Sequence, residues 1–139
     1  MTNEERAYLA GLVDGEGCIT CVYGNTGIPQ ILVAVAMNSE EIIKYLESIF
    51  GGVVTHPKEK PVWEWRVNGA NCKEILEAIK PYSRVKRRAV NLGLAFVKTM
   101  KPRQYQGNGL TEDEFLTKCA LAEQIRSLTS QGVRRAACS

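Results

Sequence analysis

The chain has 139 residues, of which 45% are hydrophobic and 24% charged, a balance typical of a water-soluble globular protein with a substantial core. No apolar run approaches the length of a membrane span, so we expect no membrane partner. The net charge of +3 permits a polyanionic partner but does not require one. We therefore treat residues 1–139 as a single domain.

The five cysteines are scattered along the chain, and only Cys18 and Cys21 have CxxC spacing. An extended strand would point these two thiols to opposite faces, which argues against a zinc or redox site. The first residues do not resemble a signal peptide. We expect free thiols and an intracellular, reducing compartment, either a bacterial or phage-host cytoplasm or an organelle.

Capping residues, apolar periodicity and turn-forming glycines predict the elements of the first half of the chain. Thr2 with Glu5 forms a capping box, and Ser39 is a second helix N-cap. The predicted elements are a helix at about 3–14, strands at 17–23 and 30–37, and a helix at 40–50.

The second half begins with another predicted hairpin and continues as helices. The predicted elements are strands near 52–56 and 62–68 and helices near 71–79, 84–100 and 111–129. A polar loop at 101–110 precedes the last helix, and the chain is expected to fray from Ser130. The order αββαββα with extra C-terminal helices predicts an α+β fold.

The most informative segment is residues 9–17, which read LAGLVDGEG. Glycines in a helix interior are unfavourable, so their density here indicates close backbone approach by a second helix. If that helix comes from a second copy of the chain, two Glu16 carboxylates meet on a symmetry axis, where a divalent cation would offset their repulsion. The expected dimer contact is Leu9, Ala10, Gly11, Leu12 and Val13. A glycine-rich helix end with a solvated Glu16 is the alternative.

This segment closely resembles the LAGLIDADG motif of homing endonucleases and departs from it at Val13, Gly15 and Glu16. The resemblance covers nearly the whole chain. It implies an αββαββα domain whose saddle-shaped antiparallel sheet packs on the helices with one face and on the DNA major groove with the other. One motif per chain implies a homodimer that cuts near-palindromic DNA sites.

The resemblance also implies roles for individual residues. Glu16 would bind Mg²⁺ or Mn²⁺, and the backbone carbonyl of Gly15 would add a ligand. Lys86 matches the position of an active-site lysine that stabilises charge on phosphate. Asn38 is the nearest match to a polar residue that positions water.

Alternation along the strands assigns the face that would meet DNA. The core side is expected to hold Ile19, Cys21, Tyr23, Ile31, Val33, Val35, Met37, Trp63, Trp65 and Val67. The DNA side then holds Cys18, Thr20, Val22, Gln30, Leu32, Ala34, Ala36, Glu64, Arg66 and Asn68. Arg66 can read guanine, Asn68 or Gln30 can read adenine, and Lys58 and Lys60 would reach phosphates. A surface sheet without a ligand is the alternative for each of these residues.

A basic cluster lies at the start of the fourth predicted helix. The residues Arg84, Lys86, Arg87 and Arg88 are cations where the helix dipole disfavours positive charge. This local conflict indicates a nearby polyanion, and we assign Arg84, Arg87 and Arg88 to DNA binding. A solvated basic patch is the alternative.

Taken together, the residues and the resemblance predict a metal-dependent, intron-encoded homing endonuclease that hydrolyses both DNA strands at a long near-palindromic site. Two alternatives of the same fold stay open, namely a non-cleaving DNA-binding protein and an intron RNA maturase. A structural protein with a helical interface is the third, and it leaves the basic cluster unexplained.

Overall fold

The computed structural model describes the backbone of residues 1–100 and 110–138 and the side chains of 1–100 and 110–129. The predicted polar loop at 101–110 lies almost entirely outside these residues. The elements are α1 (Asn3–Glu16), β1 (Gly17–Tyr23), β2 (Pro29–Met37), α2 (Glu40–Phe50), β3 (Val53–Thr55), β4 (Trp63–Asn68), the short 3₁₀ helix η1 (Gly69–Asn71), α3 (Cys72–Ile79), α4 (Arg87–Lys98) and α5 (Glu112–Cys138). Within the described chain, no helix is both long and apolar enough to span a membrane.

The predicted α+β order αββαββα is confirmed, and so are both helix caps. The Thr2 Oγ1 accepts from the Glu5 backbone N–H at 3.1 Å, and the Ser39 Oγ accepts from that of Ile42 at 3.3 Å. Two boundaries are wrong. The helix predicted from residue 84 begins at Arg87, and α5 continues to Cys138 rather than fraying from Ser130.

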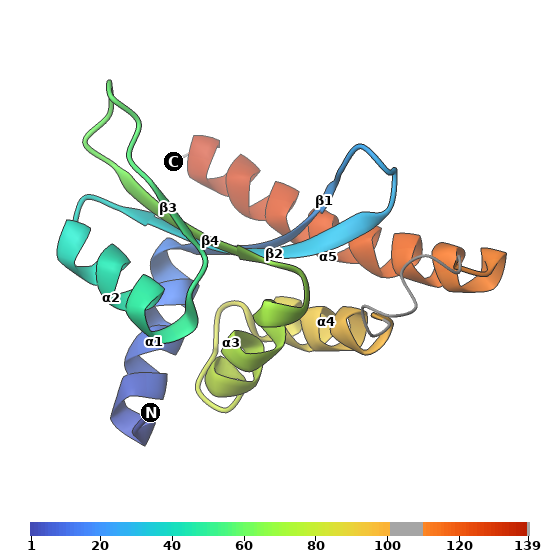
Figure 1. Cartoon of the computed structure of the whole chain (residues 1–139), viewed down its shortest axis with the longest axis horizontal. Coiled ribbons are helices and arrows are strands. Elements are labelled where there is room, and N and C mark those ends of the chain that lie inside the picture. Colours follow the sequence, from blue (N-terminus) through green and yellow to red (C-terminus); the bar gives the residue numbers. More distant parts are fainter. Residues whose placement is uncertain (101–109, 139) are drawn as a thin grey trace.

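The four strands form one antiparallel sheet in the order β1-β2-β4-β3 (Figure 1). Each central strand has two partners, so the register fixes which side chains lie side by side. Thr20 lies opposite Leu32, which in turn lies opposite Asn68. Cys18, Ala34 and Arg66 form a second such row. It lies two residues closer to α1 along β1.

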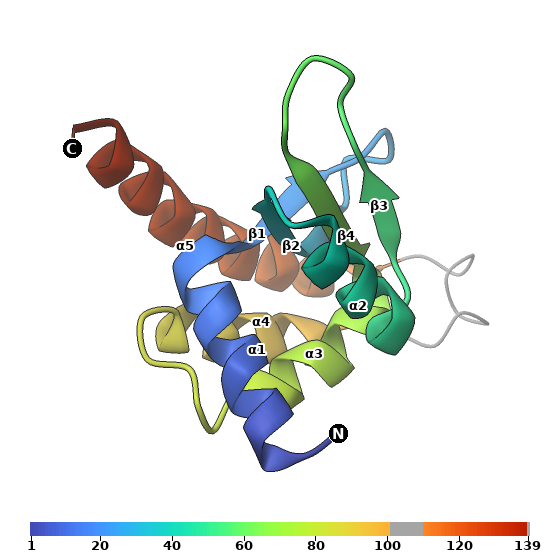
Figure 2. The ribbon, with the colours of Figure 1, turned by 90° about the vertical axis from the view of Figure 1, so that its left-hand side faces the viewer.

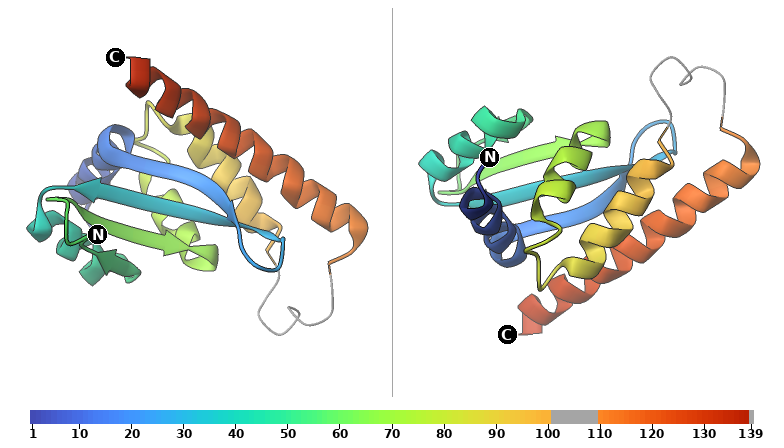
Figure 3. Two further views of the ribbon diagram at one scale, coloured as in Figure 1. Left: turned by 90° about the horizontal axis from the view of Figure 1, so that it is seen from above. Right: turned by 90° about the horizontal axis from the view of Figure 1, so that it is seen from below.

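The helices α1, α3 and α4 lie beneath the sheet, and α2 lies beneath it at the end where β2 finishes (Figures 1 and 2). The long α5 runs diagonally along β1 and also contacts α4. Seen from above, the strands lie in front of the helices, so no helix of the described chain crosses the upper side of the sheet (Figure 3, left). We call this upper side the open face. Its residues are Cys18, Thr20, Val22, Gln30, Leu32, Ala34, Ala36, Glu64, Arg66 and Asn68, with Val53 and Thr55 from β3.

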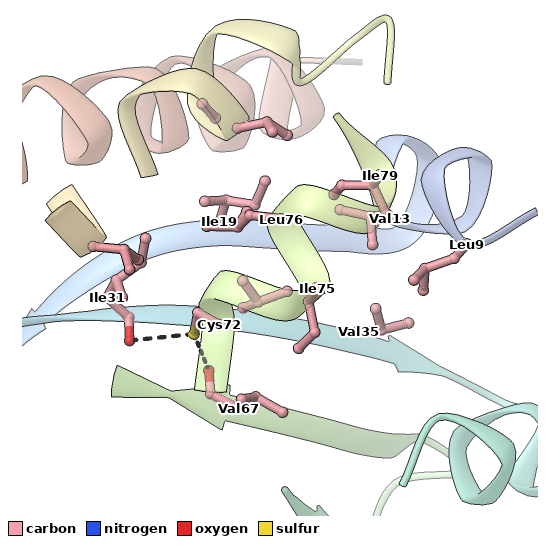
Figure 4. Packing of buried hydrophobic residues seen from close by; sticks show 14 of the residues in the cluster. Leu9, Val13, Ile19, Ile31, Val35, Val67, Cys72, Ile75, Leu76 and Ile79 are labelled. Carbon is pink, nitrogen blue, oxygen red and sulfur yellow. Dashed lines mark hydrogen bonds between the residues drawn. The ribbon is translucent and has the colours of Figure 1, made fainter. Parts of the chain in front are cut away.

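The core fills the space between the sheet and the helices. Ile31, Val35 and Val67 of the strands pack with Ile75 and Ile79 of α3, and Figure 4 shows this packing. The Cys72 thiol, fully buried at the start of α3, donates to the Val67 carbonyl at 3.2 Å and so joins α3 to β4 (Figure 4). Of the ten residues predicted for the core side, Tyr23 is the most exposed, at 38%.

Tyr23 instead contacts α5. Its hydroxyl donates to Glu123 Oε1 at 3.0 Å, and the Arg126 guanidinium lies 5.2 Å from its ring centroid. Further along, the Thr129 hydroxyl donates to the Ile19 carbonyl at 2.9 Å. These contacts attach the C-terminal helix to β1 along the length of the strand.

The turn from α1 into β1 requires glycine at position 17. A Cβ on Gly17 would lie 2.7 Å from the Val13 Cα, a distance that no relaxed structure permits. The chain therefore passes directly from helix to strand, and the last turn of α1 lies against the first residues of β1.

Candidate active site and nucleic-acid interface

The two acidic residues of the 9–17 segment have different surroundings at the end of α1. Glu16 is exposed, and no described side chain or backbone group forms a hydrogen bond or ion pair with its carboxylate. Asp14, in contrast, has both carboxylate oxygens occupied. Its Oδ1 accepts from Ser83 Oγ at 2.8 Å and from the Lys86 N–H at 3.1 Å. Its Oδ2 accepts from the N–H groups of Arg84 at 2.8 Å and Val85 at 3.2 Å.

These hydrogen bonds affect the ionisation of Asp14. Partial burial acts to raise its pKa, but the donors of Arg84, Ser83, Lys86 and Val85 together hold the pKa of the Asp14 carboxyl below its usual value. Asp14 is therefore an ionised internal anchor. Its oxygens are already used by protein donors, so Asp14 does not fit the role of a metal ligand.

Lys86 is attached to the same point. Its Nζ donates to the Asp14 backbone carbonyl at 2.7 Å. That carbonyl lies in the last turn of α1, where carbonyl groups lack an intrahelical partner. The ammonium of Lys86 is thus held at the end of the helix that carries Glu16, as the predicted active-site role requires.

Gly15 lies between these two acids in the same last turn. Its Cα is open to solvent, with nothing within 4 Å of where a Cβ would be. Its carbonyl lies in the last turn of α1, where backbone carbonyls lack an intrahelical partner. Asn38 is exposed just beyond β2 and two residues after Ala36, so it continues the open face beyond the strand end.

The predicted DNA side of the sheet coincides with the open face. Arg66 and Glu64 of β4 form an ion pair there, with Arg66 Nε 3.0 Å from Glu64 Oε1. Because the pair uses Nε, the two terminal nitrogens of Arg66 stay available for a further acceptor. Thr20, Gln30 and Asn68 supply the neutral polar groups of this face.

Cys18 lies on the open face in the same row as Ala34 and Arg66. Burial raises the pKa of its thiol, while the charges of Lys86 and Arg66 act in the opposite direction. The thiol therefore stays neutral, but the two cations are close enough to be felt at the same position. The charges of Lys86, held at the end of α1, and of Arg66, on the open face, therefore both act on Cys18.

The remaining predicted cations lie in two exposed places. Lys58 and Lys60 are in the turn between β3 and β4, where the Lys60 N–H donates to the Pro57 carbonyl at 3.3 Å. Arg84, Arg87 and Arg88 are exposed around the start of α4. Arg84 and Arg87 line a shallow cleft of about 370 Å³ with Pro81 and Tyr82.

Comparison with known proteins identifies the arrangement. The model of the LAGLIDADG endonuclease family matches residues 9–94. The chain belongs to this family. No curated protein sequence matches the chain.

Several solved homing endonucleases share the LAGLIDADG fold with this chain. I-CvuI, in complex with its target, has a TM-score of 0.75 and 24% identity over 91% of this chain and 83% of that one. The archaeal intron-encoded I-Vdi141I, complexed with DNA, has a TM-score of 0.70 and 12% identity over 91% and 84%. I-TnaI has a TM-score of 0.67 and 17% identity over 94% and 97%. At these identities the likeness establishes the fold.

The structure corrects the dimer contact predicted for the LAGLIDADG helix. Leu9 is 4% exposed, and Ala10 and Val13 are fully buried in the core of their own chain, so these three cannot face a second copy. Their side chains lie on the face of α1 that packs on the sheet and α3. Gly11 and Leu12 are accessible, and Gly15 and Tyr8 extend the same outward face.

The sequence-based prediction did not assign two residues to the open face that the structure places there. Val53 lies opposite Arg66, and Thr55 lies opposite Glu64, so both β3 side chains point to the open face. Val53 is 60% exposed. Pairing the predicted second hairpin residue by residue would have found both, because directly opposed residues of an antiparallel pair share a face.

The metal expected of a LAGLIDADG endonuclease has only part of its ligand set in one chain. Within the described residues, no group of three histidine, cysteine or acidic side chains is close enough to hold a metal ion. The unpartnered carboxylate of Glu16 and the open carbonyl of Gly15 are oxygen donors of the kind that Mg²⁺ prefers. These residues fit a divalent cation.

Proposed function

We propose that this LAGLIDADG protein is a site-specific endonuclease that cuts both strands of DNA at a long, near-palindromic site. The observation that carries the proposal is the contrast at the end of α1. The carboxylate of Glu16 has no partner among the described residues, while Lys86 is anchored two residues away at the Asp14 carbonyl. A free acid and a fixed cation at one helix end are the groups that phosphodiester hydrolysis needs.

DNA is the substrate that the open face fits. An antiparallel sheet enters the major groove, where Arg66 can read guanine and Asn68 or Gln30 can read adenine. The exposed cations Lys58, Lys60, Arg84, Arg87 and Arg88 lie where they can contact the phosphates on either side. I-CvuI was solved in complex with its target and I-Vdi141I in complex with DNA, which supports double-stranded DNA as the partner here.

The active form is a homodimer joined through the outward face of α1. That face carries Gly11, Leu12 and Gly15, and a Cβ added to either glycine would have nothing within 4 Å, so a second helix can approach closely. Dimerisation in this way brings together Glu16 and Gly15 from each chain. A bound Mg²⁺ or Mn²⁺ would activate water and offset charge on the leaving oxygen. Lys86 stabilises the charge that develops on the phosphate, and Asn38 orients the attacking water.

The decisive experiment compares the wild-type chain with Glu16→Gln on a randomised duplex DNA library in the presence of Mg²⁺. We expect the wild type to cut a near-palindromic site and Glu16→Gln to bind the same site without cutting, because the amide cannot replace a metal-binding carboxylate. Glu77→Gln is the matched control. It removes an exposed acid on α3 that only approaches Lys73 at 4.0 Å, and it should cut like the wild type.

Two results would contradict the proposal. Binding of duplex DNA without cutting by the wild type would indicate a non-cleaving DNA-binding protein. Preference for a structured intron RNA over duplex DNA would indicate a maturase.

A further inference from the structure

The Asp14 side chain forms hydrogen bonds with the segment that precedes α4. Its two carboxylate oxygens accept four hydrogen bonds from four consecutive residues, 83–86, at 2.8 to 3.2 Å. Ser83 among them is fully buried. One side chain of α1 therefore dictates the backbone path of a segment almost seventy residues away in the sequence.

This arrangement lies next to the start of α4. Lys86, at the N-cap position of α4, forms no side-chain cap hydrogen bond. The N–H groups at a helix start need acceptors, and a carboxylate there also offsets the cations crowded at that end. Asp14 accepts from the N–H groups of residues 84–86, just before α4, and brings a negative charge to the cations crowded there.

The same residue also sets the position of the Lys86 side chain. Asp14 binds the Lys86 backbone N–H through Oδ1 and the Lys86 Nζ through its own carbonyl. Lys86 is thus held at both ends by one residue. A long lysine side chain otherwise has several rotatable bonds and no preferred position.

We propose that Asp14 is a positioning residue for cleavage, which fixes the Lys86 ammonium beside Glu16 at the end of α1. This inference rests on the proposed function, since it requires Lys86 to act on the reacting phosphate. A displacement of a reacting group by about 1 Å can slow a reaction by about a hundredfold. Asp14→Asn should produce a loss of that order, because its NH₂ group would face N–H donors that now meet an oxygen.

The test measures the single-turnover cleavage rate at saturating DNA, the Kd for DNA, and the backbone amide signals by NMR. In Asp14→Asn we expect a rate lowered by about 10²-fold, a Kd close to that of the wild type, and changed amide shifts and faster hydrogen exchange at Arg84, Val85 and Lys86. Ser83→Ala removes one donor and leaves the three backbone donors in place, so its effect should have the same direction and be smaller.

A double-mutant cycle separates positioning from a general structural role. Lys86→Met should lower the rate by itself, and adding Asp14→Asn to it should lower the rate no further, since both substitutions remove the same effect. Glu77→Gln again serves as the control, and thermal melting shows whether each variant is folded. If Asp14→Asn does not fold, Asp14→Glu takes its place, because it keeps the charge and moves the acceptor by one methylene.

The possible results are distinguishable. A folded Asp14 variant that cuts at the wild-type rate overturns the inference, as do additive losses in the cycle or amide signals that do not change. A wild-type chain that binds DNA and never cuts overturns the proposed function instead, and the amide signals then still report whether Asp14 holds residues 84–86.

Discussion

The difference between Asp14 and Glu16 follows from helix geometry. Side chains two residues apart on a helix do not share a face, so when one points into the protein the other points away. Asp14 points toward the segment before α4 and is saturated by donors, whereas Glu16 points to solvent. A metal-binding acid must have free oxygens, and the spacing of the motif provides one anchored acid and one free acid in the same turn.

Lys118 is a lysine in an unusual environment for a charged residue. Its side chain is only 6% exposed, and its Nζ lies 4.9 Å from the centroid of the Phe96 ring. Burial lowers the pKa of Lys118 from the usual value of 10.5, while Cys21 and Glu114 act in the opposite direction. Burial therefore disfavours the charged form of Lys118 in the folded protein relative to the unfolded chain.

This environment predicts a pH-dependent stability. A lowered pKa in the folded state means that the unfolded chain binds more protons, so the free energy of unfolding rises with pH up to about 10.5. Lys118→Met should remove this rise, so the stability of the variant relative to the wild type should fall as the pH approaches about 10.5. Urea unfolding at several pH values measures the difference, with Lys98→Met, at an exposed position on α4, as the control. A constant difference would contradict the prediction.

Among the helices and strands, the sequence predicted the features that depend on neighbouring residues. The caps at Thr2 and Ser39 and the alternation of the strands depend on residues near in sequence, and the structure confirms them. The start of α4 was misplaced because residues 84–86 bind Asp14 of another element and do not belong to the helix. Dimer contacts were misassigned at Leu9, Ala10 and Val13 for a similar reason, since the motif alone does not say which face of α1 the chain's own core uses.

The candidate site also combines features set by neighbouring residues with features set by contacts between distant elements. The open face could be predicted because strand alternation is local, but Val53 and Thr55 required the register of β3 against β4. The approach of Lys86 to the end of α1 came only from the family resemblance. The hydrogen bonds that create this approach join residues that no sequence pattern connects.

The turn between α2 and β3 gives a prediction at this scale. Gly52 has a φ of +94°, and a Cβ there would lie 2.6 Å from the Arg66 carbonyl oxygen. Gly52→Ala should lower the free energy of unfolding by about 1–3 kcal/mol, because it adds backbone strain and a steric overlap. Gly24→Ala is the control, since a Cβ at that position would have nothing within 4 Å and its φ is not positive. Equal unfolding midpoints for the two variants would rule this account out.

For the whole molecule, the proposed dimer and the stability of the single chain can be separated at Gly11. A Cβ at this position would have no described atom within 4 Å, and leucine would favour the helix by roughly 1 kcal/mol over glycine. It would, however, keep a second α1 from approaching closely. Gly11→Leu should therefore melt at or above the wild-type temperature and sediment as a monomer. A Gly11→Leu chain that still sediments as a dimer would place the contact elsewhere, and Lys73→Leu, on the exposed side of α3, is the control for adding a leucine.

The contact between α5 and β1 has a consequence for self-association. An unpaired outer strand offers its backbone to strands of other chains and promotes aggregation. Here the Thr129 hydroxyl occupies the Ile19 carbonyl of β1, and the opposite outer strand, β3, is only three residues long. Both margins of the sheet are therefore poor templates for aggregation. Substitutions on the open face leave these margins intact, so the surface that would read DNA can diversify without making the protein prone to form aggregates.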